Sequence, residues 1–309
     1  MRQVHTFSEL NLSKSWVTIG SYDGIHLGHQ SIIRPLVAEA HLNHAPAVVI
    51  TFYPHPSTVL RGTQGPFYLS SPQEQVDLLA THGVDFVLTM NFDLKMAALS
   101  AEEFVQYLKN HLGISSLWVG DDFALGRKRQ GTVPVLRELG KVYDFDVETI
   151  APFILNGNIV SSSRIRSLLQ QGEVQQAATL LGRLYRFSGQ VVRGDGRGKS
   201  LGFPTANMAI PPERMVPHTG VYATWALLKD RCLPAITNIG IRPTFENQFV
   251  LPRVEAHILD ADLDLYGQEI SLEFVEFIRP ERKFSTVNDL IKQIKEDCLQ
   301  TQELLVHAR

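Results

Sequence analysis

The chain has 309 residues, of which 44% are hydrophobic and 20% charged, a composition typical of a globular protein with two domains. Its formal net charge of −3 gives no overall basic field, so nucleic acid and anionic membranes are not expected partners. No apolar N-terminal region and no run of about 18 apolar residues occurs, which argues against export and membrane insertion. Cys232 and Cys298 match no metal-binding spacing and are expected to be reduced thiols in the cytoplasm.

The first half of the chain alternates β-rich runs with amphipathic helical patterns. Strands are expected at residues 15–20, 47–53, 84–90, 115–120 and 142–150. Helices are expected after His29, from Ser71-Pro72 and from Ser100. Strands that alternate with helices predict an α/β fold with a doubly wound parallel sheet, whose ligand site lies beyond the carboxyl ends of the strands.

The pattern changes near residue 184, where successive strands begin that are joined by connections rich in Gly, Pro and Asp. A single helix closes the chain, with one apolar face interpreted as core packing: Val287, Leu290, Ile291, Ile294 and Cys298. This half predicts a small antiparallel β-barrel or sandwich with one packed helix. The expected domains are therefore residues 1–183 and 184–309.

The segment after the first expected strand has the features of a phosphate-binding turn. Gly20, Gly24 and Gly28 permit tight turns and close backbone approach, and the following helix offers free N–H groups to phosphate. His26 and His29 lie three residues apart at the helix start, so both rings can face one ligand. For an isolated pair at this spacing, capping or surface histidines are the ordinary interpretation. A zinc pair would need further ligands, and no suitably spaced Cys or carboxylate supplies them.

These histidines also belong to a longer pattern. His26-Leu27-Gly28-His29 resembles the HxGH signature of the nucleotidylyltransferase superfamily, which carries a second motif at the start of a later helix. The stretch Val160–Arg166 resembles that second motif. Its hydroxyls, including that of Ser162, can cap a helix, and Arg166 lies one turn further on, so both can face one phosphate. Two motifs in this order are far more specific than either alone.

Further segments resemble the bacterial FAD-synthetase branch of that superfamily: Thr51–Pro56, and Val119–Phe123 with Gly126, Arg129 and Gly131. The resemblance favours a flavin over a pantetheine or nicotinate substrate, and it implies ligand-binding roles for Asp122 and Arg129. Ser21-Tyr22 and Leu125 depart from the family pattern. These departures concern the flavin pocket and leave the phosphate site intact.

The implied reaction is attack of the FMN phosphate on the α-phosphorus of ATP, with release of pyrophosphate. This nucleophile is already an anion at neutral pH, so the protein needs no general base. It needs to align two anions and neutralise the charge on the transferred group. His26, His29, Arg166 and Mg²⁺ suit that task.

A glycine-rich segment, Gly194–Ser200, occurs early in the second half. It is not a Walker A motif, because three residues instead of four separate Gly194 from Gly198 and no amphipathic helix follows. It is not a dinucleotide-binding turn either, because no strand–helix unit surrounds it. Taken alone, it is interpreted as a glycine-rich hairpin.

The continuation Gly202–Asn207 changes this interpretation. Pro204 favours an extended backbone, in which Thr205 and Asn207 point to the same side and can offer oxygen ligands to Mg²⁺. This stretch resembles the riboflavin kinase signature. Other matching segments are Gly220–Ala223, Asn238–Phe245, Val254-Glu255, Leu265–Gly267, Arg279 and Phe284.

The riboflavin kinase resemblance covers nearly the whole second half and implies a six-stranded barrel that binds ATP and riboflavin. It implies ligand-binding roles for Gly196, Gly198, Lys199, Gly202 and Asn238. Lys199 stands where arginine is common, which keeps the charge but loses a bidentate fork.

The catalytic carboxylate of riboflavin kinases corresponds to Glu255. By strand alternation, Glu255 shares a face with Arg253 and His257. A polar strand face is usually solvated, but the 5′-hydroxyl of riboflavin needs to lose a proton before it attacks. The resemblance assigns that task to Glu255.

The whole pattern predicts a bifunctional enzyme that phosphorylates riboflavin to FMN and adenylylates FMN to FAD. A kinase with an altered N-terminal half and a non-catalytic flavin-binding protein are the alternatives. Two phosphate sites and a base argue against the second alternative, because a binding protein needs neither.

Overall fold

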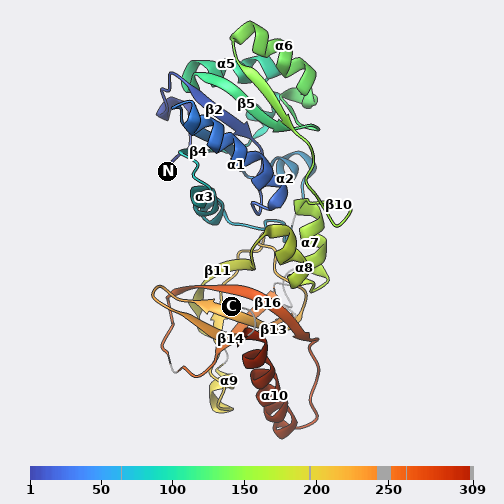
Figure 1. Cartoon of the computed structure of the whole chain (residues 1–309). Helices are drawn as coiled ribbons and strands as arrows, with labels where there is room; N and C mark the ends of the chain where they lie inside the picture. The colour runs from blue at the N-terminus through green and yellow to red at the C-terminus, as the bar shows by residue number, and fades with distance from the viewer. Residues whose placement is uncertain (64, 195, 242–251, 262, 307–309) are drawn as a thin grey trace. The chain divides into compact units, whose positions relative to one another are not determined.

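The computed structural model describes residues 1–63, 65–194, 196–241, 252–261 and 263–306 (Figure 1). The chain divides into two compact units. The first holds Met1–Gln64 and Tyr68–Ser162, and the second holds Gly65–Phe67 and Ser163–Arg309.

The first unit is built on a six-stranded sheet in which every pairing is parallel. The strands, in spatial order, are β1 (Arg2–Val4), β4 (Phe86–Asn91), β3 (Ala47–Tyr53), β2 (Ser15–Ile19), β5 (Ile114–Gly120) and β8 (Asp146–Ile150). The expected doubly wound parallel sheet is therefore confirmed. From β2 the chain proceeds outward through β3 and β4, and then returns to the other side of β2 as β5. The switch point between β2 and β5 is where a sheet of this type binds its ligand.

Helices cover both faces of this sheet (Figure 1). On one face α1 (Leu27–Leu42) and α3 (Pro72–Thr81) bury Trp16 of β2; on the other, α5 (Ala101–Leu112) and α6 (Val133–Tyr143) bury Val17. Alternate residues of β2 thus pack into the cores on the two faces of the sheet. This agrees with the burial of every residue of β2.

Serine residues set the start of two of these helices, as the sequence predicts. The hydroxyls of Ser71 and Ser100 accept from the N–H groups of Glu74 and Glu103, and each glutamate returns a bond to its serine. The unit's shorter elements are η1 (Phe7–Glu9), α2 (Pro56–Arg61), α4 (Leu94–Ala98), β6 (Ala124–Leu125), η2 (Arg127–Arg129), β7 (Gly131–Thr132), β9 (Ile154–Leu155) and β10 (Asn158–Ile159).

The second unit contains a closed barrel of six strands with every pairing antiparallel. In order around the barrel they are β11 (Tyr185–Val192), β12 (Ala206–Met208), β15 (Pro252–Ile258), β14 (Cys232–Ile241), β13 (Gly220–Leu227) and β16 (Glu269–Arg279). This confirms the expected barrel. The unit's helices are α7 (Ser162–Gln170), α8 (Val174–Leu181), α9 (Arg197–Ser200) and α10 (Val287–Val306).

Helix α10 packs on the outside of the barrel (dark red in Figure 1). Its C-terminal half buries Leu305 against Trp225, whereas Val287 at its start is 58% exposed. Leu290 and Ile294 line a cavity beside the barrel. The expected apolar face is therefore only partly a core face, because its N-terminal half borders a binding space. Among the described residues, no helix combines the length and apolarity needed to cross a membrane.

Candidate active sites

The turn after β2 is strained and anchored at the switch point of the sheet. Tyr22 and Ile25 have positive φ values of 46° and 39°, which non-glycine residues rarely adopt. The phenol of Tyr22 is buried and donates to Thr18, whose own hydroxyl donates to the Trp118 carbonyl at 2.6 Å. Burial raises the pKa of Tyr22, so the phenol stays neutral. Thr18 is thus the polar partner of the buried Tyr22 hydroxyl.

The departure at Ser21 is tolerated because the turn is held through its backbone. Gln75 and Thr51 both donate to the Ser21 carbonyl oxygen, at 2.6 and 3.1 Å. These bonds do not depend on which side chain residue 21 carries. The turn that is expected to bind phosphate is therefore anchored through its backbone at Ser21.

His26 and His29 lie together at the start of α1. Their rings stack with centroids 3.6 Å apart, and His26 is 4% exposed. Nδ1 of His26 accepts from the backbone N–H of His29 at 3.2 Å, so in the neutral ring the proton is on Nε2. His26 thus caps the helix, as the ordinary interpretation expects, and its ring lies against that of His29 at the helix start.

The two expected phosphate motifs meet within the first unit. The Ser162 hydroxyl donates to the Asp23 carbonyl oxygen at 2.9 Å. A Cβ on Gly28 would lie 3.1 Å from the Val160 carbonyl oxygen, so a larger residue there would need a small shift of its surroundings. The start of the second motif thus lies against the histidine turn, while the expected sharing of one phosphate by Ser162 and Arg166 stays a prediction.

Asp23 is a site residue that the sequence reasoning did not single out. It is 4% exposed, and its carboxylate accepts from the backbone N–H groups of Leu69 and Ser70 at 2.9 and 3.1 Å. The Ser70 hydroxyl in turn accepts from the Gly24 N–H. Asp23 therefore ties the phosphate turn to the segment that leads into α3.

Arg166 lies on α7 in the second compact unit. Its Nε donates to the Phe67 carbonyl oxygen at 2.6 Å, and its guanidinium lies 3.9 Å from the centroid of the Phe67 ring. Phe67 belongs to the short segment 65–67 that is part of the same unit. The phosphate role of Arg166 stays a prediction.

The loop after β5 brings Asp122 and Arg129 together. The Arg129 guanidinium donates to the Asp122 carbonyl oxygen at 2.8 Å. Gly126 has a φ of 74°, and a Cβ there would lie 2.7 Å from the Ala101 nitrogen, which explains the glycine. This loop leaves the sheet beside β2, on the other side of the switch point from the histidine turn. Its position agrees with the ligand-binding roles that the resemblance implies.

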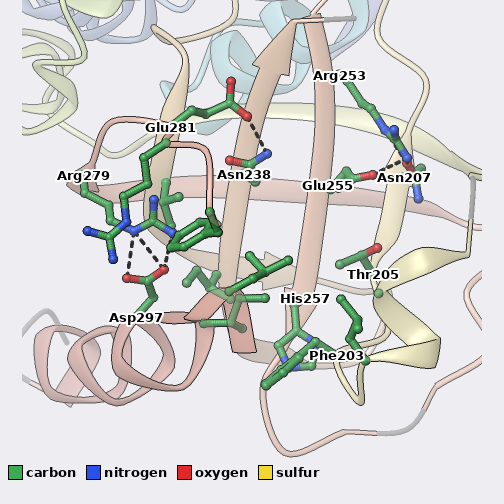
Figure 2. Close-up of a pocket in the computed structure, with 18 of the residues that line it drawn as sticks. Phe203, Thr205, Asn207, Asn238, Arg253, Glu255, His257, Arg279, Glu281 and Asp297 are labelled. Atoms are coloured by element: carbon green, nitrogen blue, oxygen red, sulfur yellow. Dashed lines mark hydrogen bonds and ion pairs between the residues drawn. The ribbon is translucent and has the colours of Figure 1, made fainter. Parts of the chain in front are cut away.

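The barrel brings its expected site residues into a row across three strands. Register places Glu255 on β15 directly opposite Asn207 on β12 and Asn238 on β14. Thr205 lies two residues before Asn207, and all four residues line a cavity of about 430 Å³ (Figure 2). The cavity therefore brings together a hydroxyl, a carboxylate and two side-chain amides.

The glycine-rich segment packs directly over this row. A Cβ on Gly194 would lie 2.3 Å from the Asn207 side chain, and one on Gly198 would lie 3.2 Å from the Thr205 hydroxyl. Gly196 has a φ of 69° with open space around it, so there glycine is needed for the backbone conformation. Helix α9 spans only Arg197–Ser200, which agrees with the rejection of a Walker A motif.

Thr205 and Asn207 fit a Mg²⁺ ion. Both offer neutral oxygen atoms beside a glycine-lined space, which suits a hard cation that keeps water and phosphate oxygens. Among the described residues, no group of three His, Cys, Asp or Glu side chains is arranged to hold a metal ion. The zinc alternative for His26 and His29 therefore gains no further ligand from the described part of the chain.

Arg253 contacts both the carboxylate and the amide of the row (Figure 2). Its guanidinium lies 2.5 Å from Glu255 Oε1 and donates from Nε and Nη2 to Asn207 Oδ1, at 3.2 Å each. Two residues beyond Glu255, the ring Nδ1–H of His257 donates a hydrogen bond to the Pro204 carbonyl oxygen at 2.8 Å. The sequence predicted that these three side chains share a face but gave no role to Arg253.

The far end of the cavity is apolar and is closed by α10. Arg279 binds Asp297 through contacts of 2.6–3.0 Å, and Asp297 is 2% exposed. The Asn238 amide donates to Glu281 at 3.1 Å. The apolar residues that line the cavity near this end include Val221, Ile236, Phe284, Leu290 and Ile294.

A second cavity of about 260 Å³ adjoins the first. Lys199, Pro204 and Tyr266 line it, and Thr205 lines both cavities. Gly202, with a φ of 88°, forms the turn between Lys199 and this shared residue. Residues 242–245 of the kinase-like pattern lie outside the described part of the chain.

Comparison with known proteins identifies the family. A FAD synthetase family model matches residues 8–164, and a riboflavin kinase family model matches residues 181–305. The bifunctional riboflavin kinase/FMN adenylyltransferase of Escherichia coli (strain K12) is 37% identical, over 98% of this chain and 96% of that protein. The protein of the same description from Bacillus subtilis (strain 168) is 34% identical, over 92% of this chain and 90% of its own length.

Similarity of structure also covers nearly the whole chain. A crystal structure described as a macrolide-efflux protein from Streptococcus pneumoniae has a TM-score of 0.88 at 28% identity, over 97% of this chain and 98% of that chain. Both halves of the sequence resemblance are thus confirmed over the lengths that the motifs indicate. The chain belongs to the bifunctional riboflavin kinase/FMN adenylyltransferase family.

Proposed function

We propose that this chain phosphorylates riboflavin to FMN in its barrel domain and adenylylates FMN to FAD in its parallel-sheet domain, using ATP in both reactions. The observation that carries the kinase assignment is Glu255, placed in register between Asn207 and Asn238 on the wall of a cavity. The domains are residues 1–183 and 184–309, and the enzyme works in the cytoplasm without nucleic acid or membrane partners. Its net charge of −3 suits this setting.

The two cavities of the barrel suit the two kinase substrates. The larger one has an apolar end formed by Leu290 and Ile294 that suits the flat isoalloxazine ring. The smaller one carries Lys199 and Tyr266, a cation and an aromatic ring suited to a nucleotide. Because Thr205 lines both, the hydroxyl of one substrate and the γ-phosphate of the other meet beside it.

In the kinase reaction Glu255 takes the proton of the riboflavin 5′-hydroxyl. The oxygen then bonds to the γ-phosphorus as the bond to ADP breaks, which gives FMN and ADP. Thr205 and Asn207 would hold Mg²⁺, which when bound neutralises phosphate charge. Asn238 fixes the flavin side of the site, and Gly196 and Gly198 let the backbone approach the phosphates.

In the adenylyltransferase reaction an FMN phosphate oxygen attacks the α-phosphorus of ATP, and pyrophosphate leaves. The rings of His26 and His29 lie together at the start of α1, and both stabilise the charge that builds on the transferred group. Ser162 and Arg166 bind phosphate oxygens, and Mg²⁺ accompanies the nucleotide.

A product assay on the purified chain tests this function. Incubation with riboflavin and MgATP should give FMN first and FAD later, separated by chromatography. Accumulation of FMN without FAD would indicate an altered N-terminal half. Flavin binding without either product would show that the chain is a binding protein and would overturn the proposal.

A further inference from the structure

Arg253 binds two side chains, Glu255 and Asn207, whose oxygen atoms have to be accessible in the proposed kinase reaction. One guanidinium binds the carboxylate of Glu255 at 2.5 Å and the amide oxygen of Asn207 at 3.2 Å (Figure 2). This arrangement follows from the fold. Strand alternation puts residues 253 and 255 on one face of β15, and register puts Asn207 opposite Glu255.

These contacts conflict with the roles of both partners. Asn207 Oδ1 is the atom that would bind Mg²⁺, and a guanidinium on the same oxygen repels a divalent cation. Arg253 also occupies Oε1 of Glu255, one of the two oxygens that could accept the riboflavin proton. The contacts therefore have to loosen before the reaction.

The surroundings of Arg253 offer its guanidinium another partner once the nucleotide is present. Arg253 lines the larger cavity together with Gly196, Gly198 and Thr205, and Thr205 is the residue beside which the γ-phosphate would enter from the smaller cavity. The arginine guanidinium can form two parallel hydrogen bonds to phosphate oxygens. The phosphates of a nucleotide also carry more negative charge than a single carboxylate does. The side chains of Arg253 and Glu255 are 31% and 23% exposed, so the exchange needs no opening of the core.

We propose that Arg253 is a positioning residue that couples nucleotide binding to release of the base. Without nucleotide it binds Asn207 and Glu255. When MgATP binds, the guanidinium transfers to phosphate oxygens, which leaves Asn207 to the metal and Glu255 to the riboflavin hydroxyl. No covalent bond changes in this step. The proposal rests on the kinase function proposed above.

The test compares Arg253→Met with Arg186→Met in the full-length chain. Arg186 likewise pairs with a barrel glutamate at 2.5 Å, Glu273 on the neighbouring strand, but does not line either cavity, so it serves as the control. Mn²⁺ binding without nucleotide is followed by electron paramagnetic resonance, and the KM values for MgATP and riboflavin are measured separately.

Arg253→Met should bind Mn²⁺ without nucleotide several-fold more tightly than the parent, because Asn207 Oδ1 is released and the repelling guanidinium is removed. Its KM for MgATP should rise about tenfold or more, as expected for loss of a charged hydrogen bond, while the KM for riboflavin changes little. Arg253→Lys should restore part of the MgATP affinity. Adding Asn207→Ala to Arg253→Met should abolish the gain in Mn²⁺ affinity.

Unchanged Mn²⁺ affinity together with an unchanged KM for MgATP would overturn the proposal. Equal rises in both KM values with a lower melting temperature would also overturn it, because they would show a purely structural role. If the proposed kinase function is itself wrong, the parent chain forms no FMN, and this result is distinct from the two outcomes above. The Mn²⁺ titration still reports on Arg253 in that case.

Discussion

Replacing Asp297 with asparagine tests how α10 is fixed to the barrel. The Asp297 carboxylate is 2% exposed and binds the Arg279 guanidinium through contacts of 2.6–3.0 Å. Gln293, one turn earlier on the helix, also donates to it at 2.7 Å. Asp297→Asn keeps the shape, so no cavity forms, but it leaves the Arg279 charge without its counter-ion.

The burial of Asp297 sets the expected loss in the free energy of unfolding. Breaking a buried ion pair by removing one charge typically costs about 3–5 kcal/mol. Because the Arg279 side chain retains 18% exposure and also donates to the Pro280 carbonyl, we expect the lower end, about 3 kcal/mol. For a unit of about 150 residues this lowers Tm by roughly 6–12 °C. The KM for riboflavin should rise as well, because Leu290 and Ile294 on the same helix line the cavity.

Differential scanning calorimetry of the full chain measures the effect, since the transition of the other unit provides an internal reference. Asp230→Asn is the matched control. Asp230 pairs with Arg231 on the surface at 3.2 Å, with 69% of its side chain exposed, so its loss should leave Tm unchanged within error. A drop below 2 °C in Asp297→Asn, or an equal drop in the control, would refute the reasoning.

Three further predictions follow from single sites. Gly198→Ala should lower riboflavin phosphorylation about tenfold or more without affecting FMN adenylylation, because the new Cβ would lie 2.4 Å from the Phe203 carbonyl oxygen. The release of ADP measures the kinase rate, and a rate equal to that of the parent chain would contradict the prediction. Tyr22→Phe should lower the free energy of unfolding of the first unit by about 1 kcal/mol, measured by urea unfolding, because Thr18 loses a buried donor. An unchanged free energy would show that the Tyr22–Thr18 hydrogen bond does not stabilise the unit. Burial, with Asp297 and Asp260 adding to it, raises the pKa of Cys298 to about 11, so iodoacetamide at pH 8 should label exposed Cys232 first and Cys298 only as the pH rises. Peptide mass spectrometry would contradict this by finding equal labelling of both thiols at pH 8.

Much of the fold could be predicted from local pattern, because its signals are local. Alternation of strands and helices predicted the parallel sheet, and Ser71 and Ser100 marked helix starts through capping boxes that need only three residues. In the barrel, Pro204 and a two-residue spacing sufficed to put Thr205 and Asn207 on one side of the same cavity.

What could not be predicted depends on contacts between distant segments. The register that sets Glu255 opposite Asn207 is fixed by pairing of whole strands, so the contacts of Arg253 are invisible in the sequence. Asp23 is buried by the backbone of residues 69 and 70, a contact that no spacing rule describes. For α10, periodicity identified an apolar face, but whether a core or a cavity lies against it depends on the barrel.

The central claim is that one chain carries two separate transferase sites, and a pair of variants tests it most directly. Both reactions are measured on purified, folded Glu255→Gln and His29→Ala chains, with riboflavin or FMN supplied and MgATP present. Glu255→Gln should lower FMN formation by about 10²–10⁴-fold and leave FAD formation from FMN unchanged, because only the first reaction needs a base. His29→Ala should lower FAD formation by about 10²–10³-fold and leave FMN formation unchanged. Equal damage to both reactions in either variant, or full kinase turnover in Glu255→Gln, would contradict the account.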